Sequence, residues 1–195
     1  MTKPLPGLRA QAEFAPELSL GRHLGPPSHD ARHAAVVALI YPIAGEPNIA
    51  LTLRPRSMQS HAGQVCLPGG MLERGESPPQ AAVRELNEEL GVCVQTDEIL
   101  GTLSPIFVFA SNFLVTPFVA YLDVRPIFSP SSDEVEKLIE LPVSYLQDPT
   151  IETIQIRRGP VAFSAPCFRY LDSKIWGATT IMLAELADVI ASARS

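Results

Sequence analysis

The segment Gly70–Val92 reads GMLERGESPPQAAVRELNEELGV and decides the fold. Ser77 can form a capping box with the glutamine three positions later, and Pro78 occupies the first helical position, where a missing amide proton costs nothing. Gly91 can adopt the left-handed conformation that ends a helix. The sequence therefore predicts a helix that begins at about Pro78 and ends just before Gly91.

This helix presents two different faces. Four apolar side chains fall in one arc of about 100° and predict the buried stripe: Ala82, Val83, Leu86 and Leu90. Glu85, Glu88 and Glu89 fall in a second arc. This face could be an ordinary solvated one with an exposed Arg84–Glu88 pair. However, like charges three and four residues apart repel unless a cation lies among them, and the helix contains no lysine, so we favour a metal site.

The same segment matches a defined pattern: glycine, five residues, glutamate, seven residues, then arginine, glutamate, an aliphatic residue, any residue, two glutamates, any residue, glycine and an aliphatic residue. It resembles the box of the Nudix hydrolase family. The resemblance implies an α/β (α+β) Nudix fold, with a mixed β-sheet sandwiched between helices. It also implies hydrolysis of a nucleoside diphosphate linked to another moiety, with Mg²⁺ or Mn²⁺ as the cofactor.

The resemblance also implies roles for the residues of the box. Glu85 and Glu89 are expected to be metal ligands, Glu88 is the next ligand, and the Gly70 carbonyl contributes. Such a metal ion would neutralise the anionic diphosphate and lower the pKa of a bound water. Arg84 is expected to orient the glutamates by charge-assisted hydrogen bonds.

The general base remains open between two candidates, because members of the family place it in different loops. Glu85 is the first candidate and Glu134 the second. The expected catalytic residues are therefore Glu85, Glu88, Arg84 and Glu134.

A second motif lies upstream, in the segment Leu51–Gly70. It resembles the additional motif of the Nudix coenzyme A pyrophosphatase subfamily. The matching positions are Thr52, Arg54, His61, Gly63, Val65 and the Pro68-Gly69-Gly70 turn. Leu67 departs from the pattern, since phenylalanine is more usual there, and we interpret this change as a packing detail.

Coenzyme A carries a 3′-phosphate besides its diphosphate, and guanidinium groups bind phosphate oxygens bidentately. We therefore expect Arg54, Arg56 and His61 to bind the substrate, together with Gly69 of the glycine turn. Two alternatives stay open: His61 as a structural histidine bonded to backbone, and Arg56 as a solvated surface arginine.

The resemblance implies cleavage of coenzyme A or its thioesters to 3′,5′-ADP and 4′-phosphopantetheine. The alternative is the same chemistry on another nucleoside diphosphate derivative, such as ADP-ribose or NADH. A third hypothesis, from another class, is a catalytically silent Nudix module that senses nucleotides. The sequence speaks against it, because every ionisable position of the box is present.

Composition fits one domain in a reducing compartment. The chain has 195 residues, 46% of them hydrophobic, and a net charge of −6, which argues against broad binding to nucleic acid or anionic membranes. It has no signal-peptide core and no apolar run long enough to span a membrane. Three cysteines form no close-spaced motif, as is typical of a reducing compartment. We expect a cytoplasmic protein with a small-molecule substrate, and the sequence does not predict its oligomeric state.

Residues 1–31 are rich in proline and glycine and predict a loosely ordered lead-in with one short helix near Leu8–Leu18; residues 32–195 predict a single domain. Strands are expected at 34–43, 49–54, 65–67, 99–103, 115–122, 135–140, 151–157 and 161–168. A short helical turn is expected at 141–146 and a final helix at 176–192. Residues 105–112 predict an apolar loop, in which Phe107 and Phe109 belong to the core or touch the pantetheine arm; we favour the core.

Overall fold

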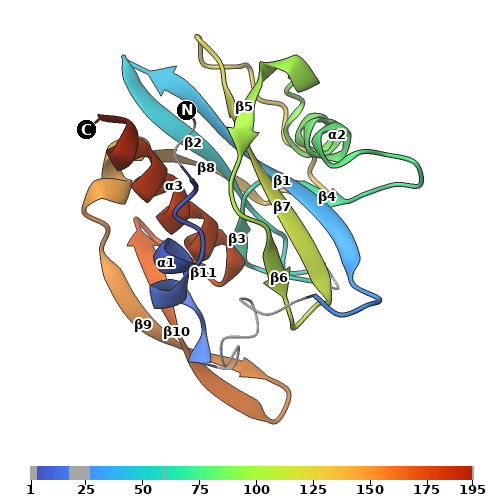
Figure 1. Ribbon diagram of the computed structural model, residues 1–195, viewed down its shortest axis with the longest axis vertical. Helices are drawn as coiled ribbons and strands as arrows, with labels where there is room; N and C mark the ends of the chain where they lie inside the picture. Colours follow the sequence, from blue (N-terminus) through green and yellow to red (C-terminus); the bar gives the residue numbers. More distant parts are fainter. Residues whose placement is uncertain (1–3, 18–26, 59, 195) are drawn as a thin grey trace.

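The computed structural model describes residues 4–17, 27–58 and 60–194. Two sheets and two long helices dominate the fold (Figure 1). The first sheet contains β1 (Arg32–Ile43), β2 (Glu46–Leu53), β3 (Val65–Cys66), β4 (Gly69–Met71), β5 (Ile99–Thr102), β6 (Ile106–Val108), β7 (Phe113–Tyr121) and β8 (Lys137–Pro142). The second contains β9 (Ile151–Arg158), β10 (Val161–Tyr170) and β11 (Ser173–Trp176). The helices are α1 (Leu8–Gln11), α2 (Pro78–Leu90) and α3 (Ala178–Arg194), with 3₁₀ turns η1 (Ala12–Phe14), η4 (Thr96–Glu98) and η5 (Val143–Gln147).

Strand β1 is the centre of the first sheet. It runs parallel to β7, in a register that pairs Arg32 with Phe113, and antiparallel to β2 and β4. The sheet is therefore mixed, as predicted. The side chains of β1 alternate between two hydrophobic clusters because successive residues of a strand point to opposite faces. Ala34, Val36, Ala38 and Ile40 pack in one cluster, and Ala35, Val37, Leu39 and Tyr41 in the other.

The two clusters are covered by different helices. Leu86 and Leu90 of α2 join the cluster of Ala35, whereas Leu183 and Leu186 of α3 join the cluster of Ala34. Figure 1 shows α2 on one side of β1 and β7 and α3 on the other. The predicted arrangement, a mixed sheet sandwiched between helices, is confirmed.

Residues 4–17, within the segment predicted as a lead-in, pack against α3. The Gln11 side-chain amide donates a hydrogen bond to the buried Glu185 carboxylate at 2.8 Å, and the Phe14 ring lies edge-on to Phe168 at 5.1 Å. The helix predicted from Leu8 ends earlier than expected, at the 3₁₀ turn η1. Ala15 is extended, with ψ 131°, because a residue before a proline disfavours the helical conformation. Leu18, the predicted end, lies outside the described residues.

Other elements differ from the predicted boundaries where pairing with a distant strand determines the structure. The predicted loop at 105–112 contains β6, which pairs with β7. The final helix begins at Ala178 rather than Trp176, since Trp176 belongs to β11 and Gly177 has φ 68°. Strand β4 was not predicted, because its glycines carry no strand signal. None of the helices in the described ranges is both long and apolar enough to cross a membrane.

Candidate functional site

Helix α2 carries most of the site and has the predicted bounds. The Ser77 amide donates to the Gln80 side-chain oxygen at 2.9 Å, which closes the capping box at the start. At the other end Gly91 has φ 68°, and its amide donates to the Asn87 carbonyl at 2.8 Å. Ala82, Leu86 and Leu90 are buried as predicted, Val83 is half-buried, and Ala81 and Glu89 are buried as well.

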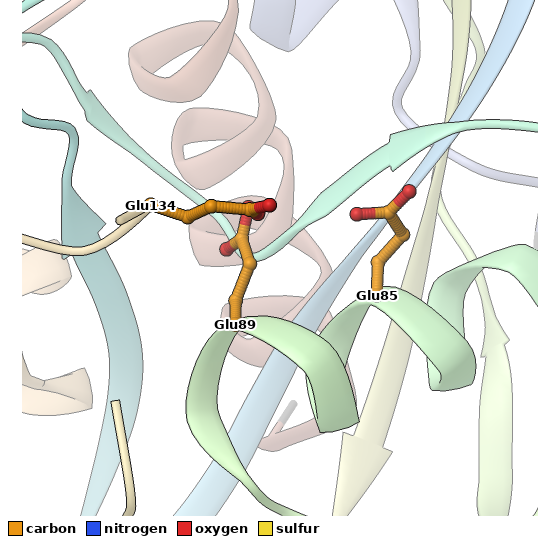
Figure 2. Close-up of side chains that lie close together, drawn as sticks. All are labelled: Glu85, Glu89 and Glu134. Carbon is orange, nitrogen blue, oxygen red and sulfur yellow. The ribbon is translucent and has the colours of Figure 1, made fainter. Parts of the chain in front are cut away.

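Three carboxylates meet beside this helix. Glu85 and Glu89 come from successive turns of α2, and Glu134 comes from the loop that precedes β8 (Figure 2). One ligand oxygen from each lies within 4.8 Å of the other two. The loop is tied to the end of α2 by the Ser131 amide, which donates to the Glu89 carbonyl at 2.9 Å. The helix and this loop therefore hold the three side chains together, and we call them the carboxylate cluster.

Glu89 is the most buried member of the cluster. Its side chain is 2% exposed, and burial raises its pKa to about 8, with a further rise from the charges of Glu85 and Glu134. Arg54 opposes that shift, since its Nη1 lies 3.4 Å from Glu89 Oε1. The other oxygen, Oε2, is buried without a hydrogen-bond partner among the described residues. A buried carboxylate oxygen needs a hydrogen-bond donor or a cation, so Oε2 is suited to bind a metal ion.

Glu85 packs against the glycine turn. A Cβ at Gly70 would lie 2.4 Å from Glu85 Oε1, so a side chain at position 70 would displace the carboxylate. Burial raises the pKa of Glu85, and the hydrogen bond from Arg84 acts in the opposite direction. At Gly69, φ is +149° and a Cβ would lie 2.3 Å from the Ala35 carbonyl oxygen. The two glycines thus let β4 approach both β1 and α2.

Arg84 joins the acidic groups around the turn. It donates to both carboxylate oxygens of Glu76 at 2.9 and 3.0 Å, and to Glu85 Oε1 at 2.9 Å. Its Nη1 also donates to Glu88 Oε2 at 2.8 Å. Arg84 thus contacts three carboxylates, and its orienting role toward a metal stays a prediction. Glu88 is 53% exposed and lies outside the carboxylate cluster. It forms the exposed Arg84–Glu88 ion pair that the sequence offered as an alternative.

The carboxylate cluster fits a divalent cation. Mg²⁺ and Mn²⁺ prefer oxygen ligands, and the cluster offers three carboxylates together with an unpartnered buried oxygen of Glu89. A dication would also offset the burial and the like-charge repulsion that raise the pKa values of Glu85 and Glu89.

A cavity of about 510 Å³ opens in front of the carboxylate cluster. Arg54, His61, Gly69 and Gly70 line it, so four of the residues predicted for substrate or metal meet the three carboxylates there. His61 has φ 57°, and its Nδ1 lies 2.9 Å from the Gln64 side-chain oxygen. Arg56 is exposed and does not line the cavity, which matches the alternative of a surface arginine.

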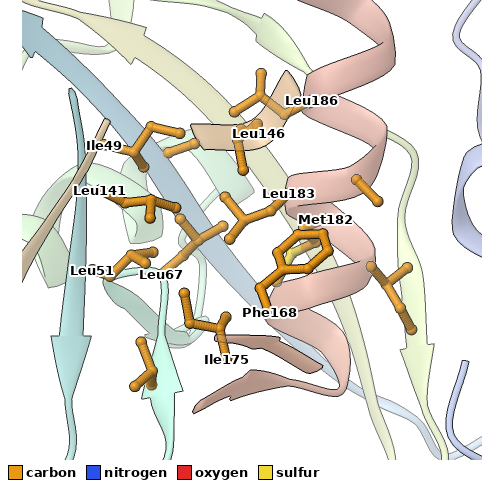
Figure 3. Packing of buried hydrophobic residues seen from close by; sticks show 14 of the residues in the cluster. Ile49, Leu51, Leu67, Leu141, Leu146, Phe168, Ile175, Met182, Leu183 and Leu186 are labelled. Atoms are coloured by element: carbon orange, nitrogen blue, oxygen red, sulfur yellow. The ribbon is translucent and has the colours of Figure 1, made fainter. Parts of the chain in front are cut away.

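The rest of the cavity wall is mostly apolar. Phe107 is buried, as the core prediction required, and Phe109 is 48% exposed; both line the cavity. Leu67 and Met182 also line it and belong to the cluster that packs α3 onto the sheet (Figure 3). Sequence reasoning missed several lining residues: Pro16, Arg32, Phe113, Phe163 and Trp176. They come from five separate segments, and only the tertiary fold brings them to one cavity.

Comparisons with known proteins identify the family of this chain. The NUDIX domain family model matches residues 31–155. A Caenorhabditis elegans Nudix hydrolase 3 is 30% identical over 79% of this chain and 72% of its own length. The uncharacterised Nudix hydrolase NudL of Pectobacterium atrosepticum is 32% identical over 83% of this chain and 84% of its own.

Solved structures show the same fold. The Mycobacterium smegmatis Nudix hydrolase RenU superposes with a TM-score of 0.56 at 20% identity, and covers 83% of this chain and 87% of its own. A MutT/nudix family protein from Enterococcus faecalis gives 0.58 at 16% identity, over 90% and 69% of the two chains. The chain therefore belongs to the Nudix family and is a Nudix hydrolase, an enzyme that cleaves phosphoric anhydride bonds.

Proposed function

We propose that this Nudix hydrolase cleaves the diphosphate of coenzyme A or its thioesters to 3′,5′-ADP and 4′-phosphopantetheine or its acylated form. The observation that carries the proposal is one cavity lined by both motifs. Arg54 and His61, from the motif that resembles the coenzyme A subfamily, line the same cavity as Glu85 and Glu89 of the Nudix box. Its apolar wall suits a long, weakly polar arm attached to the diphosphate.

Nudix hydrolases generally use divalent metals such as Mg²⁺ or Mn²⁺. Here Glu85, Glu89 and Glu134 would hold the ion, since these three carboxylates converge. Gly70 stays in the proposed set because it lies against Glu85, whereas Glu88 is the weakest candidate because it is 53% exposed and lies outside the carboxylate cluster. When bound, the metal supplies charge neutralisation of the diphosphate and a more acidic water.

The residues of this chain would position and deprotonate the attacking water. Arg84 fixes the Glu85 carboxylate through its hydrogen bond and keeps the turn closed through Glu76. A carboxylate accepts the water proton as the water oxygen attacks phosphorus, and the anhydride P–O bond breaks with its electrons on the departing phosphate. Glu85 or Glu134 takes this proton; both lie in the carboxylate cluster, and both remain candidates.

Arg54, His61 and Gly69 bind the substrate in this proposal. Arg54 lies close enough to Glu89 to contact a phosphate at the carboxylate cluster, and its Nε is buried without a partner among the described residues. Gly69 would contribute backbone groups only, since the position of its missing side chain is taken up by β1. Each of the three lines the cavity.

The test is hydrolysis by the purified protein with Mg²⁺ or Mn²⁺, offered coenzyme A, 3′-dephospho-coenzyme A, ADP-ribose and NADH separately. We expect coenzyme A to be the best substrate and to yield 3′,5′-ADP and 4′-phosphopantetheine by chromatography. Glu89→Gln and excess EDTA are the controls, and both should abolish turnover. Intact coenzyme A together with cleaved ADP-ribose would overturn the proposal.

One observation favours the alternative substrate class of ADP-ribose or NADH. Arg56, expected to help bind the 3′-phosphate, is exposed and outside the cavity lining. If no other group replaced it, recognition of the extra phosphate would be weak, and equal rates on coenzyme A and its dephospho form would support this alternative.

A further inference from the structure

An arginine that neither sequence motif contains lies at the start of β1. Arg32, Ala34 and Val36 occupy alternate positions on this strand, so their side chains share one face of the sheet, and all three line the cavity. Val115 and Phe113 on the parallel neighbour β7 line the same region. Arg32 is thus the cationic end of an otherwise apolar floor.

Strand register places this arginine at a defined separation from the carboxylate cluster. Ala35 of β1 is the Cα partner of Gly70, and the Glu85 carboxylate lies against Gly70. Arg32 is three residues before Ala35, which is about 10 Å of strand at about 3.3 Å per residue. At this separation a second anionic group of a ligand could contact Arg32 while the diphosphate lies at the carboxylates.

The guanidinium of Arg32 is held in place but not neutralised. It lies over the Phe113 ring with Cζ 4.1 Å from the ring centroid, and Nη2 donates to the Ser111 carbonyl at 3.0 Å. Among the described residues no carboxylate forms an ion pair with Arg32, whereas the other arginine of the cavity, Arg54, pairs with Glu89. The remaining N–H groups of Arg32 are available for a ligand.

Ser111 adds a second polar group at the same place. Ser111 lines the cavity, and its hydroxyl oxygen is buried with no hydrogen-bond partner in the described ranges. A fixed guanidinium next to an unsatisfied hydroxyl is a suitable pair of donors for phosphate oxygens.

We propose that Arg32, assisted by Ser111, binds a phosphate monoester that the nucleoside carries in addition to the diphosphate. This inference rests on the proposed function, in which that group is the 3′-phosphate of coenzyme A. In this assignment Arg32 takes the phosphate-binding role first expected of Arg56, which lies outside the cavity. Arg54 stays beside Glu89 at the carboxylate cluster. Arg32 is a specificity residue in this assignment and touches none of the reacting atoms.

The experiment compares Arg32→Ala and Arg32→Lys with the wild type, on coenzyme A and on 3′-dephospho-coenzyme A. A charge-assisted phosphate contact predicts a KM for coenzyme A about ten- to a hundredfold higher in Arg32→Ala. The kcat should stay nearly constant because the contact is far from the reacting phosphorus. Kinetics on the dephospho substrate should not change, and Arg32→Lys should recover part of the loss. Arg157→Ala, an exposed arginine on β9 outside the cavity, controls for the lost charge.

Binding measured by calorimetry keeps the two proposals separable. We expect wild type to bind adenosine 3′,5′-bisphosphate more tightly than adenosine 5′-phosphate, and Arg32→Ala to lose that preference, whatever the enzyme hydrolyses. Failure of the wild type to cleave coenzyme A would refute the proposed function alone. Equal losses on both substrates, no loss in Arg32→Ala, or a selective loss in Arg56→Ala instead would overturn the assignment to Arg32.

Discussion

Replacing Glu89 with glutamine should make the metal-free protein more stable, although the residue is proposed as a metal ligand. The carboxylate is 2% exposed, and its pKa is raised from 4.5 to about 8. An acid whose folded pKa is raised binds more protons in the folded than in the unfolded state between those two values, so folding stability falls as the pH rises through that window. Glutamine keeps the size of the side chain and removes this dependence.

The shift sets the size of the effect. One pKa unit corresponds to about 1.4 kcal/mol, so the proton uptake that folding requires of Glu89 costs about 3 kcal/mol at pH 7 and about 1 kcal/mol at pH 5. For a chain of this length, a change of about 3 kcal/mol in the free energy of unfolding shifts the melting temperature by roughly 6 to 12 °C. The pKa of about 8 already includes the attraction between Arg54 and Glu89, which lowers it, so no separate energy is added for this ion pair.

The assay is thermal unfolding in EDTA at pH 5 and pH 7, repeated at pH 7 with excess Mn²⁺. We expect Glu89→Gln to melt well above wild type at pH 7 and close to it at pH 5. Added Mn²⁺ should stabilise wild type and have little effect on the variant, because ligands stabilise only the state that binds them. Glu136→Gln, which removes an exposed carboxylate near the site, should change the melting temperature little. A variant no more stable than wild type at pH 7, or equally stabilised at both pH values, would refute the burial argument.

Four further changes test other parts of the site and fold. Arg84→Ala should lower Mn²⁺ affinity about ten- to a hundredfold by titration, with partial recovery in Arg84→Lys; unchanged affinity would contradict its orienting role. Gly70→Ala should displace the Glu85 carboxylate, 2.4 Å from the new Cβ, and reduce turnover without a large fall in melting temperature. Gly69→Ala meets backbone at 2.3 Å instead, so we expect lost stability in the same melting assay, and a wild-type value would be inconsistent with that clash. Phe14→Ala should cost about 3 to 5 kcal/mol in urea unfolding if residues 4–17 are part of the core.

The sequence predicted α2 well because its signals are local. Ser77 and Gly91 fix the two ends of the helix by contacts within a few residues, and helical spacing alone puts Glu85 and Glu89 on one face. No tertiary contact is needed for these inferences. The sequence therefore predicted the part of the site that one helix provides.

The third carboxylate depends on contacts that are distant in the sequence. Spacing along α2 suggested Glu88, whereas the structure brings Glu134 to the cluster and leaves Glu88 exposed beside Arg84. Glu134 is placed by the Ser131 amide, which binds the Glu89 carbonyl 42 positions earlier in the chain. Such a loop has no periodicity, so only the resemblance indicated Glu134, as a candidate base.

The two ends of the cavity differ in origin, and this difference bears on substrate choice. The carboxylate end is built by α2, β4 and the loop before β8, all within the matched residues 31–155. The opposite wall includes Pro16, Trp176 and Met182, which lie outside that range. Residues that hold the metal must satisfy the same chemistry in every diphosphate hydrolase, whereas a wall from flanking segments can change without disturbing it. The box therefore predicts the reaction, and we expect the rest of the cavity wall to decide the substrate; Arg32, which we propose binds the extra phosphate, belongs to that wall although it lies within the matched range.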